Sequence, residues 1–200
     1  LHEQASSIAA DAYAQFTNNL GVCLVTTGPG GTNALTGLAG AWLESTPVLF
    51  ISGQVQKKDM KGSRAVRQIG FQELDMVSIV KPITKYAVSV LDPKEIRFHL
   101  EKAVHLATTG RPGPVWIDIP LDVQAVMVNP DELESYKPES VEEPDVSKIV
   151  SEIIDSLNRS QRPVILAGNG IRLSGRISPI ICWKARRRRP KRGKFFSTKF

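Results

Sequence analysis

The chain has 200 residues, and 42% of them are hydrophobic, which is enough to build the packed core of one domain or one and a half. No apolar run is long enough to cross a bilayer, and the two cysteines indicate neither a disulfide framework nor a zinc site, which favours a cytoplasmic protein. The net charge of +6 comes from ten basic residues after residue 175, because the 16 basic and 20 acidic residues before that point give −4.

The first fifty residues alternate between helical and strand patterns. Residues 2–16 have apolar side chains at helical spacing, and residues 22–26 form a continuous apolar run typical of a strand buried on both faces. Glycine and proline break the chain at residues 28–31. A helix is then predicted to about residue 43, followed by a second buried strand over residues 47–52.

The same alternation continues to residue 120. The patterns predict a polar surface loop over residues 56–70, a short helix over 72–80, a strand over 86–90, a helix from Pro93 onwards and a strand over 115–119. Strands that alternate with helices at this spacing are typical of a parallel sheet with helices on both faces. We therefore expect the α/β class, with the first, second and last of these strands adjacent or nearly so.

Composition divides the chain into four segments. Residues 1–127 are the expected first domain, and its N-terminus is expected to be incomplete because the chain begins with Leu1. Residues 128–144, rich in Pro, Glu, Asp and Ser, predict a linker. Residues 145–175 predict the truncated start of a second α/β domain, with a helix over 145–157 and a strand over 163–167.

The fourth segment, residues 176–200, is a basic tail that contains the run from Arg186 to Arg192. Such a run can bind nucleic acid or an acidic membrane surface. No nucleic-acid module precedes it, however, and it follows a domain pattern that stops abruptly. We therefore interpret the tail as disordered or non-native, for example as the product of a shifted reading frame, and expect no specific nucleic-acid partner.

Four stretches together identify a family. They are His2-Glu3-Gln4, Thr27 to Asn33, Phe71-Gln72-Glu73, and Gly110 to Pro114 with Asp118-Ile119-Pro120. In order and spacing they resemble the N-terminal, pyrimidine-binding domain of thiamin-diphosphate (ThDP) enzymes of the acetolactate synthase type. The resemblance extends from Leu1 to about Gly175.

Glu3 is the predicted catalytic residue, and it is also expected to bind the cofactor. In the family that this chain resembles, the glutamate at this position hydrogen-bonds N1′ of the aminopyrimidine. That contact favours the imino tautomer, which removes the proton from C2 of the thiazolium. A carboxyl group in this role must be partly desolvated to hold its proton. Without the neighbouring motifs, Glu3 would be interpreted as a helix-terminal acid favoured by the macrodipole.

The resemblance also assigns the cofactor loop. Gly28, Pro29, Gly30 and Asn33 are expected to let the cofactor approach the backbone near the pyrimidine ring. From its residues alone, this loop could also be a phosphate cradle or simply a tight turn from strand to helix. It lacks the lysine and spacing of a P-loop and the spacing of a dinucleotide fingerprint.

Three further residues receive roles from the resemblance. Phe71 and Gln72 are expected near the substrate end of the cofactor, and Lys81 is a possible flavin contact at a position where acetolactate synthases carry arginine. Lysine and arginine are not equivalent at a planar contact. The residues before Phe71 also differ from the usual pattern, which leaves the identity of the 2-oxo acid substrate open. No metal ligand is expected here, because the three histidines have no ligand spacing.

The resemblance implies that the parent enzyme is an acetolactate synthase, which decarboxylates pyruvate on ThDP and transfers the hydroxyethyl unit to a 2-oxo acid in isoleucine and valine biosynthesis. It also implies Mg²⁺ bound by a domain absent from this chain, a possible FAD, and a homodimer or tetramer. The chain alone is expected to be inactive. Two alternatives stay open: another ThDP-dependent 2-oxo acid decarboxylase or carboligase, for example in surface-sugar synthesis, and a non-catalytic interaction protein with a basic tail.

Overall fold

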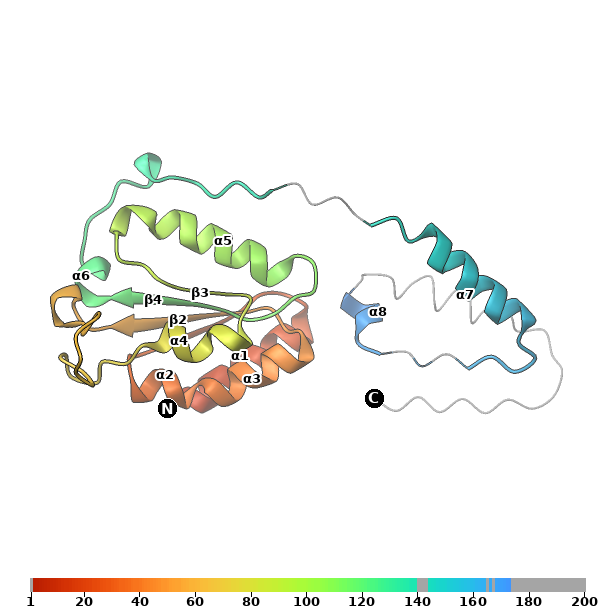
Figure 1. Cartoon of the computed structure of the whole chain (residues 1–200), viewed down its shortest axis with the longest axis horizontal. Helices are drawn as coiled ribbons and strands as arrows, with labels where there is room; N and C mark the ends of the chain where they lie inside the picture. Colours follow the sequence, from red (N-terminus) through yellow and green to blue (C-terminus); the bar gives the residue numbers. More distant parts are fainter. Residues whose placement is uncertain (1, 140–143, 165, 167, 174–200) are drawn as a thin grey trace. The chain divides into compact units, whose positions relative to one another are not determined.

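Figure 1 shows the computed structural model of the chain, which describes residues 2–139, 144–164, 166 and 168–173. Two compact units make up the chain, residues 1–140 and residues 141–200. The first unit contains the sheet and all the predicted site residues.

The first unit is built on a parallel sheet of four strands in the order β1-β2-β4-β3. The strands are β1 (Gly21–Val25), β2 (Val48–Gln54), β3 (Tyr86–Ser89) and β4 (Val115–Pro120). Their register places Val25, Ser52, Asp118 and Ser89 in one row across the sheet. Because the strands are parallel, their carboxyl ends all lie at the same edge.

Helices cover both faces of this sheet. The helices α1 (Glu3–Thr17), α3 (Leu35–Glu44) and α4 (Met76–Val80) lie on one face, and α5 (Ile96–Thr108) lies on the other (Figure 1). The core under α1 and α3 contains Trp116 stacked on Phe50, with ring centroids 5.2 Å apart, and the core under α5 contains Ile117. The α/β class, the parallel order and the adjacency of the first, second and last strands are thus confirmed. The prediction that β1 is buried on both faces is wrong, because Val22 and Leu24 of this edge strand are 57% and 72% exposed.

Two helices differ from the sequence-based prediction. The helix predicted to about residue 43 is α3, and a separate short helix, α2 (Pro29–Asn33), precedes it where only a chain break was predicted. The helix expected over residues 72–80 begins only at Met76, because Gln72 has a φ of 60°, which is left-handed and incompatible with an α-helix. A short helix, α6 (Leu121–Gln124), follows β4 directly.

The segment that follows α6 runs along α5. The Glu101 carboxylate accepts hydrogen bonds from the Ser135 hydroxyl (2.6 Å) and the Tyr136 amide (2.8 Å), and the Tyr136 ring packs edge-on against Phe98. Together with the nearby Arg97 guanidinium, which contributes most, these donors lower the pKa of Glu101 to about 2. At least part of the segment predicted as a linker is therefore held on the first unit.

The second unit contains α7 (Ser147–Arg159) and α8 (Gly170–Leu173). The strand predicted over residues 163–167 is not formed by its described members Pro163, Val164 and Leu166, and the last two are 91% and 97% exposed. A strand is stabilised by pairing with a neighbour, and the described residues of this unit include no other strand. Residues 174–200, and with them the arginine run, lie outside the described part of the chain.

The contact between α1 and α3 gives the first testable prediction. A Cβ added to Gly37 would lie 2.7 Å from the backbone carbonyl carbon of Ser7, whereas the nearest atom to a Cβ on Gly40 would be Asp11 Oδ2 at 3.6 Å. Gly37→Ala should therefore lower the free energy of unfolding by about 1–3 kcal/mol through overpacking. Gly40→Ala, in the same helix, should raise it by up to about 1 kcal/mol. Urea denaturation of both variants measures the difference, and equal effects would contradict this packing.

Candidate functional site

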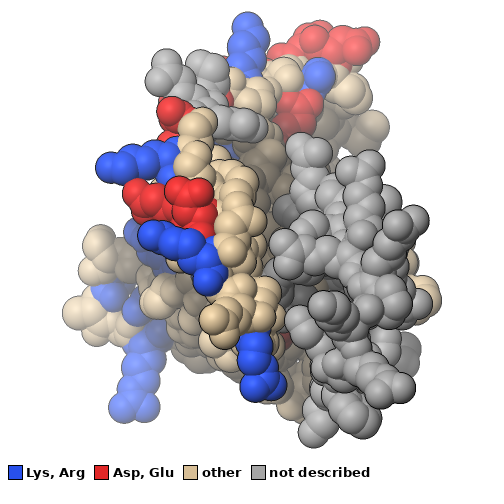
Figure 2. Space-filling model, turned by 90° about the vertical axis from the view of Figure 1, so that its right-hand side faces the viewer, with Lys and Arg blue, Asp and Glu red and all other residues tan. Residues whose placement is uncertain are grey.

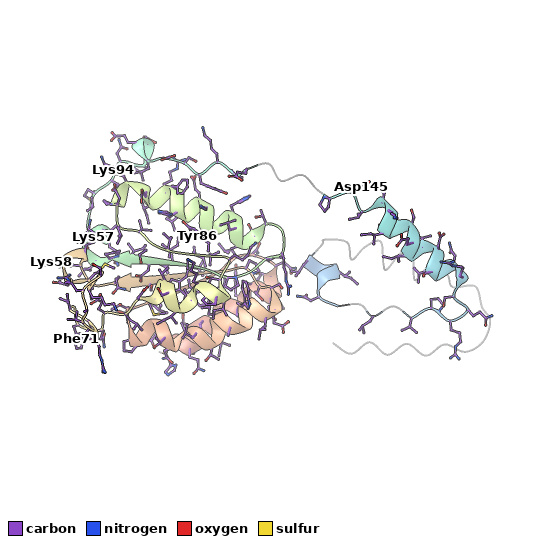
Figure 3. All side chains as sticks on the ribbon, viewed as in Figure 1. Lys57, Lys58, Phe71, Tyr86, Lys94 and Asp145 are labelled. Carbon is purple, nitrogen blue, oxygen red and sulfur yellow. The ribbon has the colours of Figure 1, made fainter. Side chains whose placement is uncertain are left out.

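Most of the predicted site residues gather at the carboxyl edge of the sheet. The loop with Gly28 follows β1, Gln54 ends β2, and the segment with Phe71 lies at the same edge, where Figure 3 also labels Lys57 and Lys58. Loops at this edge are where open α/β sheets bind their ligands. The fold alone therefore brings together residues that are far apart in the chain.

Glu3 and Asn33 form a hydrogen-bonded pair. The Asn33 amide Nδ2 donates to Glu3 Oε2 at 2.8 Å, and it lies 3.4 Å from Nε2 of His2. The Asn33 donor is the main cause of a lowered pKa at the partly buried Glu3 carboxyl, and the Glu3 backbone N–H adds to the effect. Glu3 is therefore ionised at neutral pH in this chain, with its side chain held by Asn33.

Two glycines keep the loop close to its neighbours. Gly28 has φ +57° and ψ −119°, and a Cβ there would collide with the carbonyl oxygen of Gln72. A Cβ on Gly30 would lie 2.5 Å from Thr26 Cγ2 and 3.5 Å from Glu3 Oε1. Gly28 is thus required by both its backbone conformation and the approach of another segment. Gly30 is buried beside the Glu3 carboxylate, and a side chain there would collide with Thr26.

The Phe71-Gln72 pair lies on the other side of this loop. Phe71 is 81% exposed, and the Gln72 backbone touches Gly28. The next residue, Glu73, is buried, and its carboxylate accepts hydrogen bonds from the amides of Lys61 and of Ile69, the latter at 2.8 Å. Glu73 therefore ties the polar surface loop of residues 56–70 to the Phe71-Gln72 pair.

A buried polar network lies beneath both segments. The Asp118 carboxylate accepts hydrogen bonds from Ser52 Oγ (2.5 Å), Gln54 Nε2 (3.1 Å) and Ser89 Oγ (3.2 Å). Burial raises the pKa of Asp118, and the three donors oppose that rise. Ser52, Gln54 and Asp118 are the most heavily buried polar residues of the site.

The structure brings most of the predicted site residues together. Glu3, Asn33 and Gly30 are neighbours, Gly28 touches Gln72, and Pro29 begins α2. Lys81 is exposed on the 3₁₀ turn Lys81–Ile83, and no hydrogen bond or ion pair of the described residues joins it to this group.

The sequence predicts no role for Gln54, Glu73 or Asp118. Asp118 gave a usable signal, because an acid within the apolar run of β4 must find buried hydrogen-bond donors. Gln54 and Glu73 gave none, since their partners depend on how distant segments meet.

Other kinds of site find little support among the described residues. They include no cluster of three or more His, Cys, Asp or Glu side chains placed to hold a metal ion. No helix in this part of the chain has the length and apolar character that a membrane span requires. In the view of Figure 2, acidic and basic side chains lie beside one another, so the described residues on that face form no patch of one sign.

Comparison with known proteins agrees with this geometry. Residues 1–79 match the family "Thiamine pyrophosphate enzyme, N-terminal TPP binding domain". The chain is 42% identical over 182 residues to a probable acetolactate synthase large subunit of Methanocaldococcus jannaschii, covering 87% of this chain and 29% of that protein. It is 39% identical over 178 residues to the acetolactate synthase large subunit of Lactococcus lactis, covering 88% and 30%.

A plant protein is similar to the same extent. Acetolactate synthase 3, chloroplastic, of Brassica napus is 38% identical over 174 residues, which is 84% of this chain and 26% of that protein. The chain therefore spans less than a third of the length of each of these three relatives.

The parallel sheet, the glutamate beside a glycine loop and the family match together define a TPP-binding domain of the thiamine pyrophosphate enzymes. Within that class, the chain is similar over most of its own length to acetolactate synthase large subunits. The resemblance inferred from the four stretches is confirmed.

The Glu3–Asn33 pair gives the second prediction. Asn33→Ala should raise the pKa of Glu3, because the largest cause of its lowering is removed. A carboxyl with a lowered folded-state pKa stabilises the fold above its unfolded pKa, and the effect is lost as pH falls through the folded value. The variant should therefore lose part of this acid-dependent stability. NMR titration of the Glu3 side chain measures the pKa directly.

Thr32→Ala is the matched control for this measurement. The Thr32 hydroxyl donates to the Pro29 carbonyl in the same short helix and does not touch Glu3. It should leave the pKa of Glu3 where it is in the unmodified chain. An unchanged pKa in Asn33→Ala would mean that another group holds the Glu3 carboxylate.

Proposed function

We propose that this chain is the pyrimidine-binding part of a ThDP-dependent carboligase of the acetolactate synthase type. The observation that supports it is the Glu3 carboxylate, which accepts a hydrogen bond from the Asn33 amide at 2.8 Å and lies next to Gly30. When bound, ThDP supplies the thiazolium that stabilises the carbanion formed from a 2-oxo acid. Glu3 supplies the acid–base group at the pyrimidine end.

The residues of the site fit a planar nitrogen heterocycle. A Cβ at position 30 would stand 2.5 Å from Thr26 Cγ2 and 3.5 Å from Glu3 Oε1, so only a glycine fits beside the carboxylate. A carboxylate held at a fixed orientation can hydrogen-bond a ring nitrogen, and the exposed Pro29 belongs to the same loop. Gly28, Pro29 and Gly30 are therefore proposed as the floor of the cofactor site, with Asn33 as the residue that orients Glu3.

The lowered pKa of Glu3 sets a condition on this role. To keep a proton at Oε1 or Oε2 near neutral pH, the carboxyl needs more desolvation than the chain itself provides. A ring bound beside the carboxylate would remove water from it and raise its pKa. We therefore propose that Glu3 becomes a competent acid–base group only when the cofactor is bound.

The remaining assignments are proposals of the same kind. Phe71 and Gln72 are proposed to lie near the 2-oxo acid, since they border the loop that contains Gly28. Mg²⁺ is proposed to be held by another domain. FAD binding at Lys81, assembly as a homodimer or tetramer, a cytoplasmic location and a place in branched-chain amino acid biosynthesis are proposed from the likeness to acetolactate synthases. The domain boundaries at residues 127, 144 and 175 also stay a prediction.

The third prediction concerns the chain by itself. Purified and free of host enzyme, it should form no detectable acetolactate from pyruvate, ThDP and Mg²⁺, because the described residues offer no metal cluster to hold the diphosphate. The full-length Methanocaldococcus jannaschii relative, assayed under the same conditions, is the positive control. Steady acetolactate formation by the chain alone would show that its site is complete.

The fourth prediction tests Glu3 in a chimera in which residues 2–127 replace the corresponding part of that relative. Glu3→Gln keeps the size of the side chain but cannot exchange a proton with the pyrimidine. It should slow hydrogen–deuterium exchange at C2 of bound ThDP by roughly 10²–10⁴-fold, the range for positioned acid–base groups. NMR of the quenched cofactor measures the rate.

Thermal melting of the cofactor-free chimera is the control for folding. A helix-terminal acid contributes only about 0.3–1 kcal/mol to stability, so the melting temperature should change little. If C2 exchange is unchanged while the melting temperature falls, Glu3 is a structural residue and the proposed function loses its main support.

A further inference from the structure

Asp118 is a buried acid that the proposed chemistry does not use. Its side chain lies in β4, only 1% of the residue is exposed, and no ion pair with it exists among the described residues. A buried carboxylate without a cation is costly unless hydrogen bonds satisfy it. Its donors come from both neighbouring strands: Ser52 and Gln54 from β2, and Ser89 from β3.

The direction of each hydrogen bond in this network is determined. Trp116 Nε1 donates to Ser52 Oγ at 2.8 Å, so the Ser52 hydroxyl directs its own proton to Asp118. Gln54 Oε1 accepts from the backbone amide of Val55 (3.0 Å) and from Thr27 Oγ1 (2.9 Å). Its Nε2 must therefore face the two acceptors, the Leu74 carbonyl (2.8 Å) and Asp118 Oδ2 (3.1 Å).

Gln54 consequently joins the two segments of the site. Thr27 directly precedes Gly28, and Leu74 lies two residues after Gln72. The segments touch where the Gln72 backbone meets Gly28, and Gln54 bridges them from below with its two accepting and two donating positions all occupied. Asp118 accepts the second hydrogen bond from Gln54 Nε2 and so holds this amide together with the Leu74 carbonyl.

We propose that Asp118 and Gln54 are positioning residues that set the separation of the cofactor loop, residues 27–33, from the substrate-side segment, residues 70–75. Neither is hydrogen-bonded to Glu3 in the described part of the chain, so they act through the backbone of these two segments. The effect of this separation on catalysis rests on the proposed function. The role of Asp118 and Gln54 in fixing the separation, which is their mechanical role, rests only on the hydrogen bonds.

Amide hydrogen exchange of the chain without cofactor tests the mechanical role. Asp118→Asn keeps the size of the side chain but turns one of its acceptors into a donor that faces other donors. Exchange should become about tenfold faster in residues 27–33 and 70–75, the effect of losing a buried charge-assisted hydrogen bond, while α5 stays unchanged. A uniform rise that includes α5, or no rise in either segment, would overturn the proposal.

Gln54 bonds Thr27 on one side and Leu74 on the other, and Thr27→Val tests the first of these bonds separately. It also keeps the test decisive if Asp118→Asn fails to fold. It removes one hydroxyl donor to Gln54 and leaves the bond to Leu74 intact. Exchange should rise in residues 27–33 and not in 70–75. Thr84→Val is the matched control, because the buried Thr84 hydroxyl donates to the Val80 carbonyl outside this network. An equal response in Thr27→Val and Thr84→Val would refute the bridge.

The catalytic consequence is read in the chimera saturated with ThDP. Asp118→Asn and Thr27→Val should each slow C2 exchange about tenfold with Glu3 intact, in step with the looser segments. Looser segments at an unchanged C2 rate would show that the spacing is not used in catalysis. If Glu3→Gln leaves C2 exchange unchanged, the proposed function fails, while the exchange result on the cofactor-free chain still stands.

Discussion

Parallel pairing places Asp118 beside Ser52 of β2 and beside Ser89 of β3. The positions of the loops that form the site depend on this row of polar residues. Side chains in one row of neighbouring strands point to the same face of a sheet, so three polar groups meet inside the protein. They can stay there only if they satisfy one another. The loops that leave the carboxyl ends of β1 and β2 are then held by the same network through Gln54.

Much of the fold could be predicted from sequence because its strands are continuous apolar runs, although one face of β1 is exposed. The apolar runs at residues 22–26 and 115–119 contain few polar interruptions, and the helices between them have clear spacing. The errors occurred where tertiary contacts override local pattern. Gln72 looked helical, but its left-handed backbone is packed against Gly28, and the strand expected after residue 162 has no partner among the described residues.

The candidate site was predictable in its residues and not in its connections. Glu3 and Asn33 could be named from motifs, yet the hydrogen bond between them joins positions 30 residues apart. Gln54 meets Asp118 across 64 residues, a separation at which neither periodicity nor spacing carries information. The electrostatics differed as well. A desolvated carboxyl is expected at Glu3, whereas in the structure the Asn33 amide donates to it and lowers its pKa.

The contact between Gly28 and Gln72 has a consequence for anyone who wishes to transplant this site. The conformations of the two segments depend on each other. The left-handed Gln72 places its carbonyl oxygen where only a glycine at position 28 can pack against it. If the cofactor loop alone were transferred to another parallel sheet, it would lack the Gln72 backbone against which it packs. The smallest unit that can be transferred is therefore discontinuous in sequence. It consists of residues 27–33, residues 70–75 and Gln54, which bridges them.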